Sequence, residues 1–392
     1  MWHALDLKVI VAWLTLAVLL AGPSTAWAQV PEAPPAPAVI STSRPAPAIG
    51  AAAGILIDAS DGSILWERNS RTRRAIASTT KILTALVVLE EADPEDLVTA
   101  SARAEAVGAD DALITQLHLV QGEQLTVEQM LYGLLLPSGS DAAVALAEHV
   151  GGSVEGFVRM MNERARRVGA TDSNFANADG LDHPEAYSTA YDLALITRAA
   201  MAHAEFRKMV ATPHIQVPRA GGPPRDLVNR NELLGRLQGA TGVKTGNTRN
   251  AGRSLVASAS RESEERISVV LASPDPFAES SSLLNFGFAG FRRFVIASEN
   301  EPWGQLTYGD GTSVRLMAEE GVSVLLGESA PQPRMRYRPS QGDLVVDVQG
   351  GLSVPLQPTC PGSPETCGRP EKRWSPVAAL ISLFAPLLVA LK

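Results

Sequence analysis

The chain has few cysteines and histidines, the residues that most often bind zinc and other transition metals. Its 392 residues include 2 cysteines and 6 histidines. After the first few residues, the histidines occur singly and lack the short spacings of metal ligands. They are His118, His149, His183, His203 and His214. We therefore expect no metal site and no cofactor, and we interpret these histidines as surface or hydrogen-bonded residues.

Clustered positive charge is also absent. The chain has 34 Lys and Arg residues against 42 Asp and Glu residues, which gives a formal net charge of −8 and a pI near 5.4. Proteins that bind nucleic acids concentrate basic residues on the face that meets the phosphates, so nucleic acid is not an expected partner. An acidic balance of this kind is ordinary for a soluble enzyme.

The 2 cysteines, Cys360 and Cys367, lie in one short Pro-rich segment. An oxidising compartment would favour a small disulfide between them, whereas a reducing one would leave two free thiols. Zinc is excluded there because no histidine or further cysteine lies nearby. We expect residues 358–373 to be a linker that contains this pair.

Both ends of the chain have the composition of membrane-directed segments. Lys8 precedes an apolar run, and residues 26–28 are a small-residue cleavage site, so residues 1–28 are predicted to be a signal peptide. An uncleaved anchor is the alternative. Residues 374–392 are almost uncharged, and we expect them to attach the protein to the membrane, either spanning it or lying in it. The body would then be exported to the periplasm or to the outer face of the cytoplasmic membrane.

The periodicity of the sequence changes along the body of the chain. Residues 29–47 are rich in Pro and Ala and are predicted to be a stiff linker. Residues 48–294 run from strands to a helical block and back to strands, which predicts one α/β domain whose sheet uses both ends of the segment. Residues 295–357 contain short alternating runs separated by turn signals, which predict a small all-β domain.

Local signals place the elements of the α/β domain. Strands are predicted at residues 51–58, 63–68, 242–245, 253–260 and 266–272. Helices are predicted at residues 78–91, 126–136, 141–150, 154–168, 189–203 and 283–293. Thr126 and Gln129 have the spacing of a capping box, which fixes the start of the second helix.

Ser78 and Lys81 have the spacing of a serine nucleophile and its base. Residues three apart on a helix project from one face, and Ser78 stands at the helix start, where the dipole favours developing negative charge. A serine hydroxyl needs a base beside it, and a lysine can serve if burial or a second cation lowers its pKa. Taken alone, this spacing also arises by chance in a chain of this length.

Two further segments supply polar groups for the same chemistry. Ser138 and Ser140 lie in a turn between two predicted helices, where a hydroxyl can face a cleft and relay a proton. Ser-Gly-Ser is also ordinary turn composition. On a predicted strand, Lys244 supplies positive charge for a substrate carboxylate and Thr245 offers a hydroxyl. Gly246 leaves room for a substrate backbone along the strand edge.

The three segments, in this order, resemble the serine–lysine motif set of penicillin-binding proteins and class A β-lactamases. Longer stretches are similar to low-molecular-mass penicillin-binding proteins of the D-alanyl-D-alanine carboxypeptidase family. These stretches are residues 77–86, 135–147, 177–181, 187–192, 229–234 and 242–247. The resemblance covers residues 49–293. It implies a penicillin-binding/β-lactamase-like fold, with an antiparallel sheet flanked by helices and an inserted helical block.

The resemblance implies a serine-type D-Ala-D-Ala carboxypeptidase that acts on peptidoglycan stem peptides and is acylated by β-lactam antibiotics. Ser78 would attack the carbonyl of the penultimate D-Ala, Lys81 would accept its proton, and Ser138 would help pass that proton to the leaving amine. The substrate-binding residues would be Ser140, Lys244, Thr245, Gly246 and Asn247. The backbone N–H groups of Ser78 and Asn247 would form the oxyanion hole.

The chain departs from the family pattern in three places. Ser140 stands where relatives usually have Asn, and Asn247 stands where they usually have His or Tyr. Residues 272–282, the loop before the closing helix, lack the arginine that often helps to hold the substrate carboxylate in relatives. Arg253 is a candidate substitute for that arginine.

Three alternative functions use the same residues. A DD-endopeptidase that cuts D-Ala cross-links is not separated from a carboxypeptidase by sequence. A β-lactamase is disfavoured, because no E-x-x-L-N segment that would drive deacylation lies between the second and third motifs. A catalytically impaired peptidoglycan-binding protein is the alternative without turnover, and the presence of the complete motif set argues against it. The oligomeric state is left open.

Overall fold

The computed structural model describes residues 38–108, 111, 114–298, 302–307, 313–318, 321–331, 334–338, 343–347 and 352–359. The predicted signal peptide, the pair Cys360 and Cys367 and the predicted membrane segment lie outside these residues and stay predictions. Among the helices that the structure describes, none has both the length and the apolar composition needed to cross a membrane.

A five-stranded antiparallel sheet forms the centre of the α/β part, in the order β2-β1-β9-β8-β7. Its strands are β1 (Ala53–Asp58), β2 (Ile64–Arg68), β7 (Ala240–Thr248), β8 (Gly252–Arg261) and β9 (Glu264–Leu271). Strand β1 pairs with β9 from Ala53 opposite Leu271 to Asp58 opposite Arg266. The prediction of an antiparallel sheet assembled from both ends of the segment is confirmed, and β7 lies at its edge.

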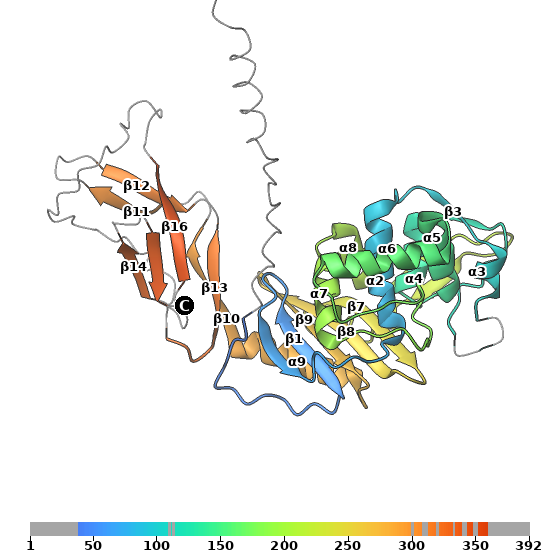
Figure 1. Cartoon of the computed structure of the whole chain (residues 1–392), viewed down its shortest axis with the longest axis horizontal. Helices are drawn as coiled ribbons and strands as arrows, with labels where there is room; N and C mark the ends of the chain where they lie inside the picture. Colours follow the sequence, from blue (N-terminus) through green and yellow to red (C-terminus); the bar gives the residue numbers. More distant parts are fainter. Residues whose placement is uncertain are drawn as a thin grey trace, which may run out of the picture. The chain divides into compact units, whose positions relative to one another are not determined.

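Helices gather beside this sheet (Figure 1). They are η1 (Ala77–Thr80), α2 (Lys81–Glu91), α3 (Ala102–Ala106), α4 (Val127–Leu135), α5 (Ser140–Gly151), α6 (Val154–Arg167), α7 (Ala190–Met201) and α8 (Ala204–Ala211). Helix α2 contacts α4, α5, α6 and α7, and it is buried continuously from Lys81 to Val88. A helix that is buried all round holds its polar side chains in an apolar medium, which matters for the lysine at its start.

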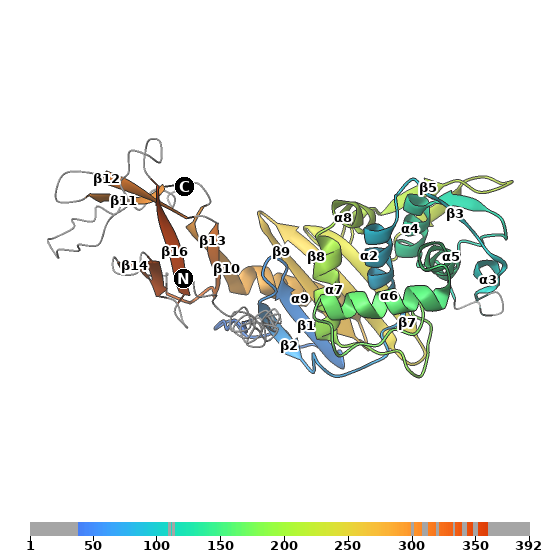
Figure 2. The same cartoon turned by 45° about the horizontal axis from the view of Figure 1, so that its top comes forward.

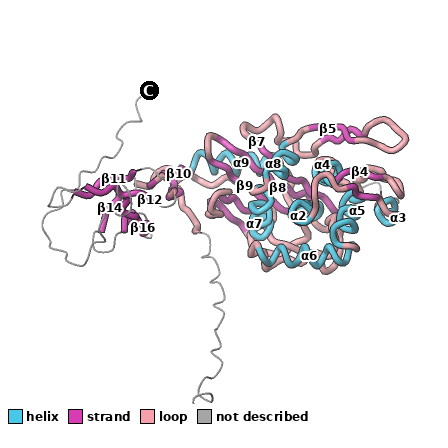
Figure 3. The backbone as a smooth tube through the Cα atoms, turned by 90° about the horizontal axis from the view of Figure 1, so that it is seen from above, coloured by secondary structure: helices cyan, strands magenta, loops and turns pink. Residues whose placement is uncertain are grey.

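A final helix, α9 (Pro276–Gly290), covers the other face of the sheet and packs on β8 and β9. Side chains therefore alternate between two cores along a strand. Ile55 and Ile57 of β1 pack on the side of the helical block, whereas Leu56 between them packs under α9. Figure 3 shows α7 and α9 on opposite sides of the strands.

Two short pairs of antiparallel strands lie at one end of the helical block (Figure 2). They are β3 (Leu97–Thr99) with β4 (Gln124–Thr126) and β5 (His214–Val217) with β6 (Arg225–Val228). A buried ion pair of 2.6 Å between Arg225 and Glu123 joins them. The sequence patterns had not indicated these strand pairs, because each strand is too short to show a clear alternation.

Two predicted helix boundaries are wrong, and one cap is confirmed. The hydroxyl of Thr126 accepts from the backbone of Gln129, and both halves of the capping box are present. Ser78 does not open an α-helix, because it lies in the 3₁₀ turn η1. The closing helix begins near Asp275, which accepts from the N–H of Ala278 at 3.2 Å, and ends at Gly290. The Asp-Pro pair at its start is a capping signal that the periodicity did not reveal.

Strands continue after the α/β part, as predicted for a small all-β domain. One sheet pairs β10 (Phe291–Ala297) with β13 (Val322–Gly327). Another follows the order β11-β12-β16-β15-β14 and comprises β11 (Pro302–Thr307), β12 (Ser313–Ala318), β14 (Arg334–Arg338), β15 (Asp343–Asp347) and β16 (Leu352–Thr359). The end of the predicted Pro-rich linker also pairs with the body, because Ile40 donates to the carbonyl of Ile64 at 2.9 Å.

Candidate active site

Ser78 and Lys81 are brought together by the tight turn at the start of α2. Residues three apart eclipse in a 3₁₀ turn, so the two side chains face each other. Nζ of Lys81 donates to Oγ of Ser78 at 3.1 Å. Ala77, just before the serine, has a φ of +50°, a left-handed conformation that concentrates at functional sites. The geometry is that of a nucleophile beside its base.

The surroundings of Lys81 lower its pKa, which suits it to act as the base for Ser78. Its side chain is fully buried, and burial lowers its pKa from 10.5 to about 8. The positive charge of Arg230 lowers the pKa further, whereas the carboxylates of Asp179 and Asp141 oppose this decrease. At pH 7 about a tenth of the molecules then hold a neutral amine that can accept a proton. A surface lysine would be neutral far more rarely.

The turn between α4 and α5 brings two serines to the site. Oγ of Ser140 lies 3.4 Å from Nζ of Lys81. Ser138 has a φ of +77°, and its hydroxyl is buried without a hydrogen-bond partner among the residues that the structure describes. Buried hydroxyls are nearly always hydrogen-bonded, so this one is free to bond a substrate or an intermediate.

Asp141 fixes this turn from behind. Its carboxylate accepts from the backbone N–H of Leu117 at 2.8 Å and from that of Leu119 at 3.1 Å. The N–H of Ser140 donates to the carbonyl of Thr115 at 2.8 Å. Charge-assisted bonds to two amides hold the loop and the turn as one unit. The serine hydroxyls therefore have fixed positions before a substrate binds.

The edge strand β7 forms the third side of the site. Lys244 is 1% exposed, and burial together with the charges of Lys81 and Arg230 lowers its pKa well below the ordinary value. Its Nζ donates to the carbonyl of Thr245 at 3.2 Å. Gly246 packs against the turn of the nucleophile, since a Cβ there would lie 3.2 Å from that of Ala77. A side chain at this position would narrow the approach to Ser78.

Asn247 follows at the exposed end of the strand. Because β7 has β8 on one side and the catalytic turn on the other, this edge can pair with an extended substrate. The structure thus brings together Ser78, Lys81, Ser140, Lys244, Thr245, Gly246 and Asn247, with Ser138 in the adjoining turn.

Arg230 is a residue of the site that the sequence patterns had not singled out. Its positive charge lowers the pKa of both Lys81 and Lys244, which places it beside the two lysines. Arg230 lies between Asn229 and Asn231, shortly before β7, in a stretch that the sequence analysis found similar to the family. Arg253, the candidate from the sequence, instead donates to the carbonyl of Pro274 at 2.9 Å.

The loop around Gly180 lies on the other side of the nucleophile. The carbonyl of Asp179 accepts a hydrogen bond from Nζ of Lys81. Gly180 has a φ of +79°, and a Cβ there would lie 2.1 Å from the carbonyl oxygen of Ala77 and 3.0 Å from the backbone nitrogen of Ser78. Only glycine allows this loop to approach the catalytic turn so closely.

Replacing Gly180 by alanine is expected to lower both stability and activity. A left-handed conformation alone costs alanine about 1 kcal/mol, and the clash with backbone atoms raises the loss of unfolding free energy to about 3 kcal/mol. Gly122→Ala is the matched control, since Gly122 has a φ of +83° and nothing within 4 Å. Urea unfolding of both variants measures the difference. Equal losses of unfolding free energy in the two variants would contradict the close approach of Gly180 to the catalytic turn.

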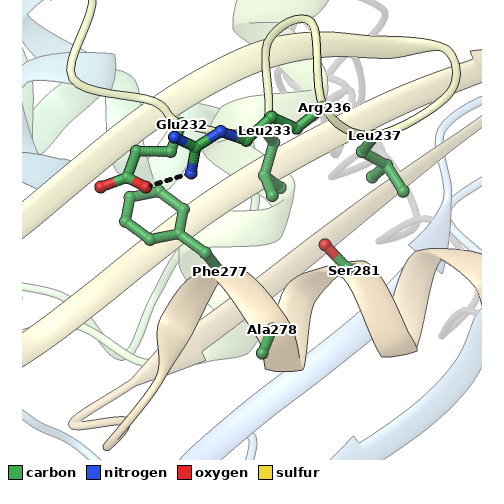
Figure 4. A pocket seen from close by; sticks show the side chains of 7 residues that line it. All are labelled: Glu232, Leu233, Arg236, Leu237, Phe277, Ala278 and Ser281. Carbon is green, nitrogen blue, oxygen red and sulfur yellow. Dashed lines mark hydrogen bonds and ion pairs between the residues drawn. The ribbon is translucent and has the colours of Figure 1, made fainter.

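A separate hollow of about 320 Å³ lies between the loop after β6 and helix α9 (Figure 4). Leu233, Leu237 and Phe277 line it, and Glu232 is paired with Arg236 at 2.6 Å. Ser281 supplies its hydroxyl, but no lysine or histidine lines the hollow to act as its base. This place lacks the groups for nucleophilic catalysis, unlike the site around Ser78.

A Ser–Lys pair at the tight turn that begins α2, a turn with two serines and a Lys-Thr-Gly edge strand together define a serine–lysine acyl hydrolase. The comparisons with known proteins identify the family. Residues 40–275 match the model of the D-alanyl-D-alanine carboxypeptidase family. The chain belongs to this family, and the prediction of a serine-type D-Ala-D-Ala carboxypeptidase is confirmed at that level.

Individual relatives agree with this assignment. The chain is 32% identical over 317 residues to D-alanyl-D-alanine carboxypeptidase DacF of Bacillus subtilis, with 78% of each chain covered. It is similar to the crystal structure of penicillin-binding protein 5 from Haemophilus influenzae, with 29% identity, a TM-score of 0.69 and coverage of 80% and 98%. It also resembles the Streptomyces K15 DD-transpeptidase structure, with 34% identity, a TM-score of 0.60 and coverage of 63% and 100%.

Proposed function

We propose that this protein removes the terminal D-alanine from peptidoglycan stem peptides through an acyl-enzyme on Ser78. The observation that carries the proposal is the contact of 3.1 Å between Ser78 Oγ and Lys81 Nζ, with the pKa of that lysine lowered to about 8. A neutral amine at this distance can accept the serine proton while the oxygen attacks a carbonyl.

The first half of the reaction forms the acyl-enzyme. Ser78 Oγ bonds to the carbonyl carbon of the penultimate D-Ala, and Lys81 takes the proton. The oxyanion is stabilised by the backbone N–H groups of Ser78 and Asn247. Collapse of the intermediate breaks the peptide bond, and the free hydroxyl of Ser138 helps to pass the proton to the leaving amine.

The leaving D-alanine carries a carboxylate that needs a positive partner. Lys244 and Arg230 are the cationic residues on this side of the site and Thr245 adds a hydroxyl, and together these groups suit a carboxylate. Water then hydrolyses the acyl-enzyme and frees Ser78. A β-lactam resembles the dipeptide, so it would acylate the same serine, in line with the penicillin-binding name of the Haemophilus relative.

Export and membrane attachment complete the proposal. Residues 1–28 have the order of an export signal, and residues 374–392 have the composition of a membrane-attached tail. Between them, residues 48–294 would form the catalytic domain, residues 295–357 the small β domain, and residues 29–47 and 358–373 the linkers. The enzyme would act at the outer face of the cytoplasmic membrane, where its substrate lies.

The decisive experiment is to incubate the full chain with a stem pentapeptide and to measure released D-alanine. A cross-linked muropeptide dimer and a peptide with an amine acceptor are tested in parallel. D-alanine release from the pentapeptide supports the proposal. Cleavage of the dimer without such release would instead establish the endopeptidase, and transfer to the amine would establish a reaction like that named for the K15 relative. A protein that binds all three peptides without turnover would be the wall-binding alternative.

Substitution of Arg230 by glutamine is expected to raise the KM for the pentapeptide about tenfold, because a charge-assisted bond to the terminal carboxylate is lost. The ascending limb of the pH profile should also move to higher pH, since the charge of Arg230 lowers the pKa of Lys81. Arg253→Gln is the matched control and should change KM little, because Arg253 donates to Pro274. If Arg253→Gln raised KM more than Arg230→Gln did, Arg253 would be the residue that binds the terminal carboxylate of the substrate.

A further inference from the structure

Three arginines lie together on the segment that leads into the catalytic turn. They are Arg71, Arg73 and Arg74, and the first two are exposed. Arg74 lies four residues before Ser78, so their Cα atoms are at most about 14 Å apart. The backbone N–H of Arg74 donates to the carbonyl of Ser188 at 2.8 Å, and the Ser188 N–H donates back at 3.0 Å. This arginine patch is therefore fixed close to the nucleophile without being part of the catalytic groups.

Two of the three guanidinium groups lie over tyrosine rings. The guanidinium carbon of Arg71 is 3.8 Å from the centre of the Tyr191 ring, and that of Arg73 is 4.8 Å from the centre of the Tyr187 ring. Contacts of this kind restrict long side chains that would otherwise sample many rotamers. An arginine held in advance loses less conformational entropy when it binds an anion.

The positive charge of the patch is only partly neutralised. Asp172 pairs with Arg73 at 2.8 Å, and both side chains are about half exposed. Glu67, the acidic side chain just before the patch, accepts instead from a serine hydroxyl. Across the part of the chain that the structure describes, Arg71 and Arg74 have no carboxylate within ion-pair distance. Two guanidinium groups can therefore bind an external anion, on a chain whose net charge of −8 repels anions elsewhere.

The position of the patch favours the substrate polymer as its partner. A stem pentapeptide ends in a carboxylate, and a glycan strand carries many such peptides. Because Arg74 lies so near Ser78, a neighbouring peptide of the same strand can present its carboxylate to the patch while the first peptide occupies the active site. Guanidinium groups bind carboxylates through two parallel N–H donors, which suits this contact.

An anionic membrane surface fits the patch less well. Segments that bind anionic lipids by charge carry clusters of about four to eight Lys or Arg residues. This patch has three, and one of them is paired with Asp172. The adjoining Tyr191 is 9% exposed, so its ring is not available for insertion between lipids.

We propose that Arg71, Arg73 and Arg74 form a second substrate-binding surface, which binds a carboxylate of the stem peptide next to the one under cleavage. This surface rests on the proposed function and extends it from a single peptide to the glycan strand. The second contact strengthens binding of the polymer by linkage and leaves binding of a free pentapeptide unchanged.

Two substrates of the full chain test the proposal, a soluble pentapeptide and uncross-linked glycan strands that carry the same pentapeptide. Arg71→Gln combined with Arg74→Gln should lower kcat/KM for D-alanine release from the strands about tenfold, and should change the value for the pentapeptide by less than about twofold. NaCl at about 0.5 M should bring the parent chain and the double variant together on the strands, because exposed charges are screened.

Arg159→Gln combined with Arg219→Gln is the matched control. Both side chains are exposed, and neither has a carboxylate within ion-pair distance among the described residues. The control removes the same charge elsewhere and should leave both substrates unaffected. Lysine at positions 71 and 74 keeps the charge and should recover part of the lost activity on the strands. An equal loss on both substrates, or no loss on the strands, would overturn the proposal.

Failure of the second surface is distinguishable from failure of the proposed function. If the parent chain releases no D-alanine from either substrate, sedimentation with purified peptidoglycan sacculi decides, with Ser78→Ala as the background. Binding that is about tenfold weaker in the double variant supports the surface, and equal binding overturns it. Weaker binding to phosphatidylglycerol vesicles, together with the parental rate on the strands, would assign the patch to lipid and also overturn the proposal.

Discussion

Ser78→Ala is expected to abolish D-alanine release, with kcat reduced by a factor of about 10³ or more. The variant keeps Lys81 and the basic side of the site, but no oxygen remains to form the acyl-enzyme. The same change should remove the covalent adduct with benzylpenicillin, which mass spectrometry of the intact protein detects. Both readouts depend on one atom, so they should be lost together.

Ser281→Ala is the control for this variant, because Ser281 carries its hydroxyl in the hollow beside α9, without a lysine or histidine in the lining. It should release D-alanine and form the penicillin adduct as the parent chain does. Calorimetric binding of pentapeptide to Ser78→Ala confirms that the site is intact. Residual release by Ser78→Ala at more than a few per cent would mean that another group is the nucleophile.

The catalytic groups could be predicted from sequence where the chemistry is local. Ser78 and Lys81 are three residues apart, so a single helical turn decides their contact. The capping box of α4 is likewise formed by two residues in one turn. In each case, the physics that forms the feature acts within a few residues.

The remaining parts of the site depend on contacts between distant segments. The carbonyl of Asp179 reaches Lys81 across 98 positions, and Ser140 reaches it across 59. No periodicity records such contacts. The position of Arg230 depends on the loop that precedes β7, so its charge on the two lysines became visible only in three dimensions.

The tight packing around Ser78 is another feature that sequence patterns do not reveal. Gly180 and Gly246 both approach the same short turn: a Cβ at Gly180 would clash with the Ala77 carbonyl oxygen at 2.1 Å, and one at Gly246 would lie in tight contact with Ala77 Cβ at 3.2 Å. Glycine in a loop is ordinary, so the reason for it appears only with its neighbours. The site is thus built by a local nucleophile–base pair that distant loops enclose and desolvate.

Desolvation leads to the second large prediction, which concerns the pH dependence of acylation. Because only neutral Lys81 can accept the serine proton, kcat/KM should rise with pH and reach half of its limit near pH 8. An ordinary exposed lysine would place this limb above about pH 10. The rate of acylation by benzylpenicillin, measured from about pH 6 to about pH 10, gives the profile without a need for product detection.

Lys81→Arg tests the same point by substitution. Arginine keeps the positive charge but stays protonated across this range, so acylation should fall by a factor of about 10³ or more at every pH. Lys81→Met, which removes the charge and fits the apolar surroundings, should be equally inactive and shows whether the fold tolerates the change. Circular dichroism of both variants checks folding.

The charged residues around Lys81 determine in which direction a substitution should move the ascending limb of the pH profile. Arg230→Gln removes a positive charge and should move the limb to higher pH, whereas Asp141→Asn removes a negative charge and should move it to lower pH. A general effect on folding would not produce opposite shifts. A limb that stays in place in both variants, or a flat profile through pH 8, would mean that Lys81 does not titrate as the base. In that event the proton of Ser78 must leave by another route.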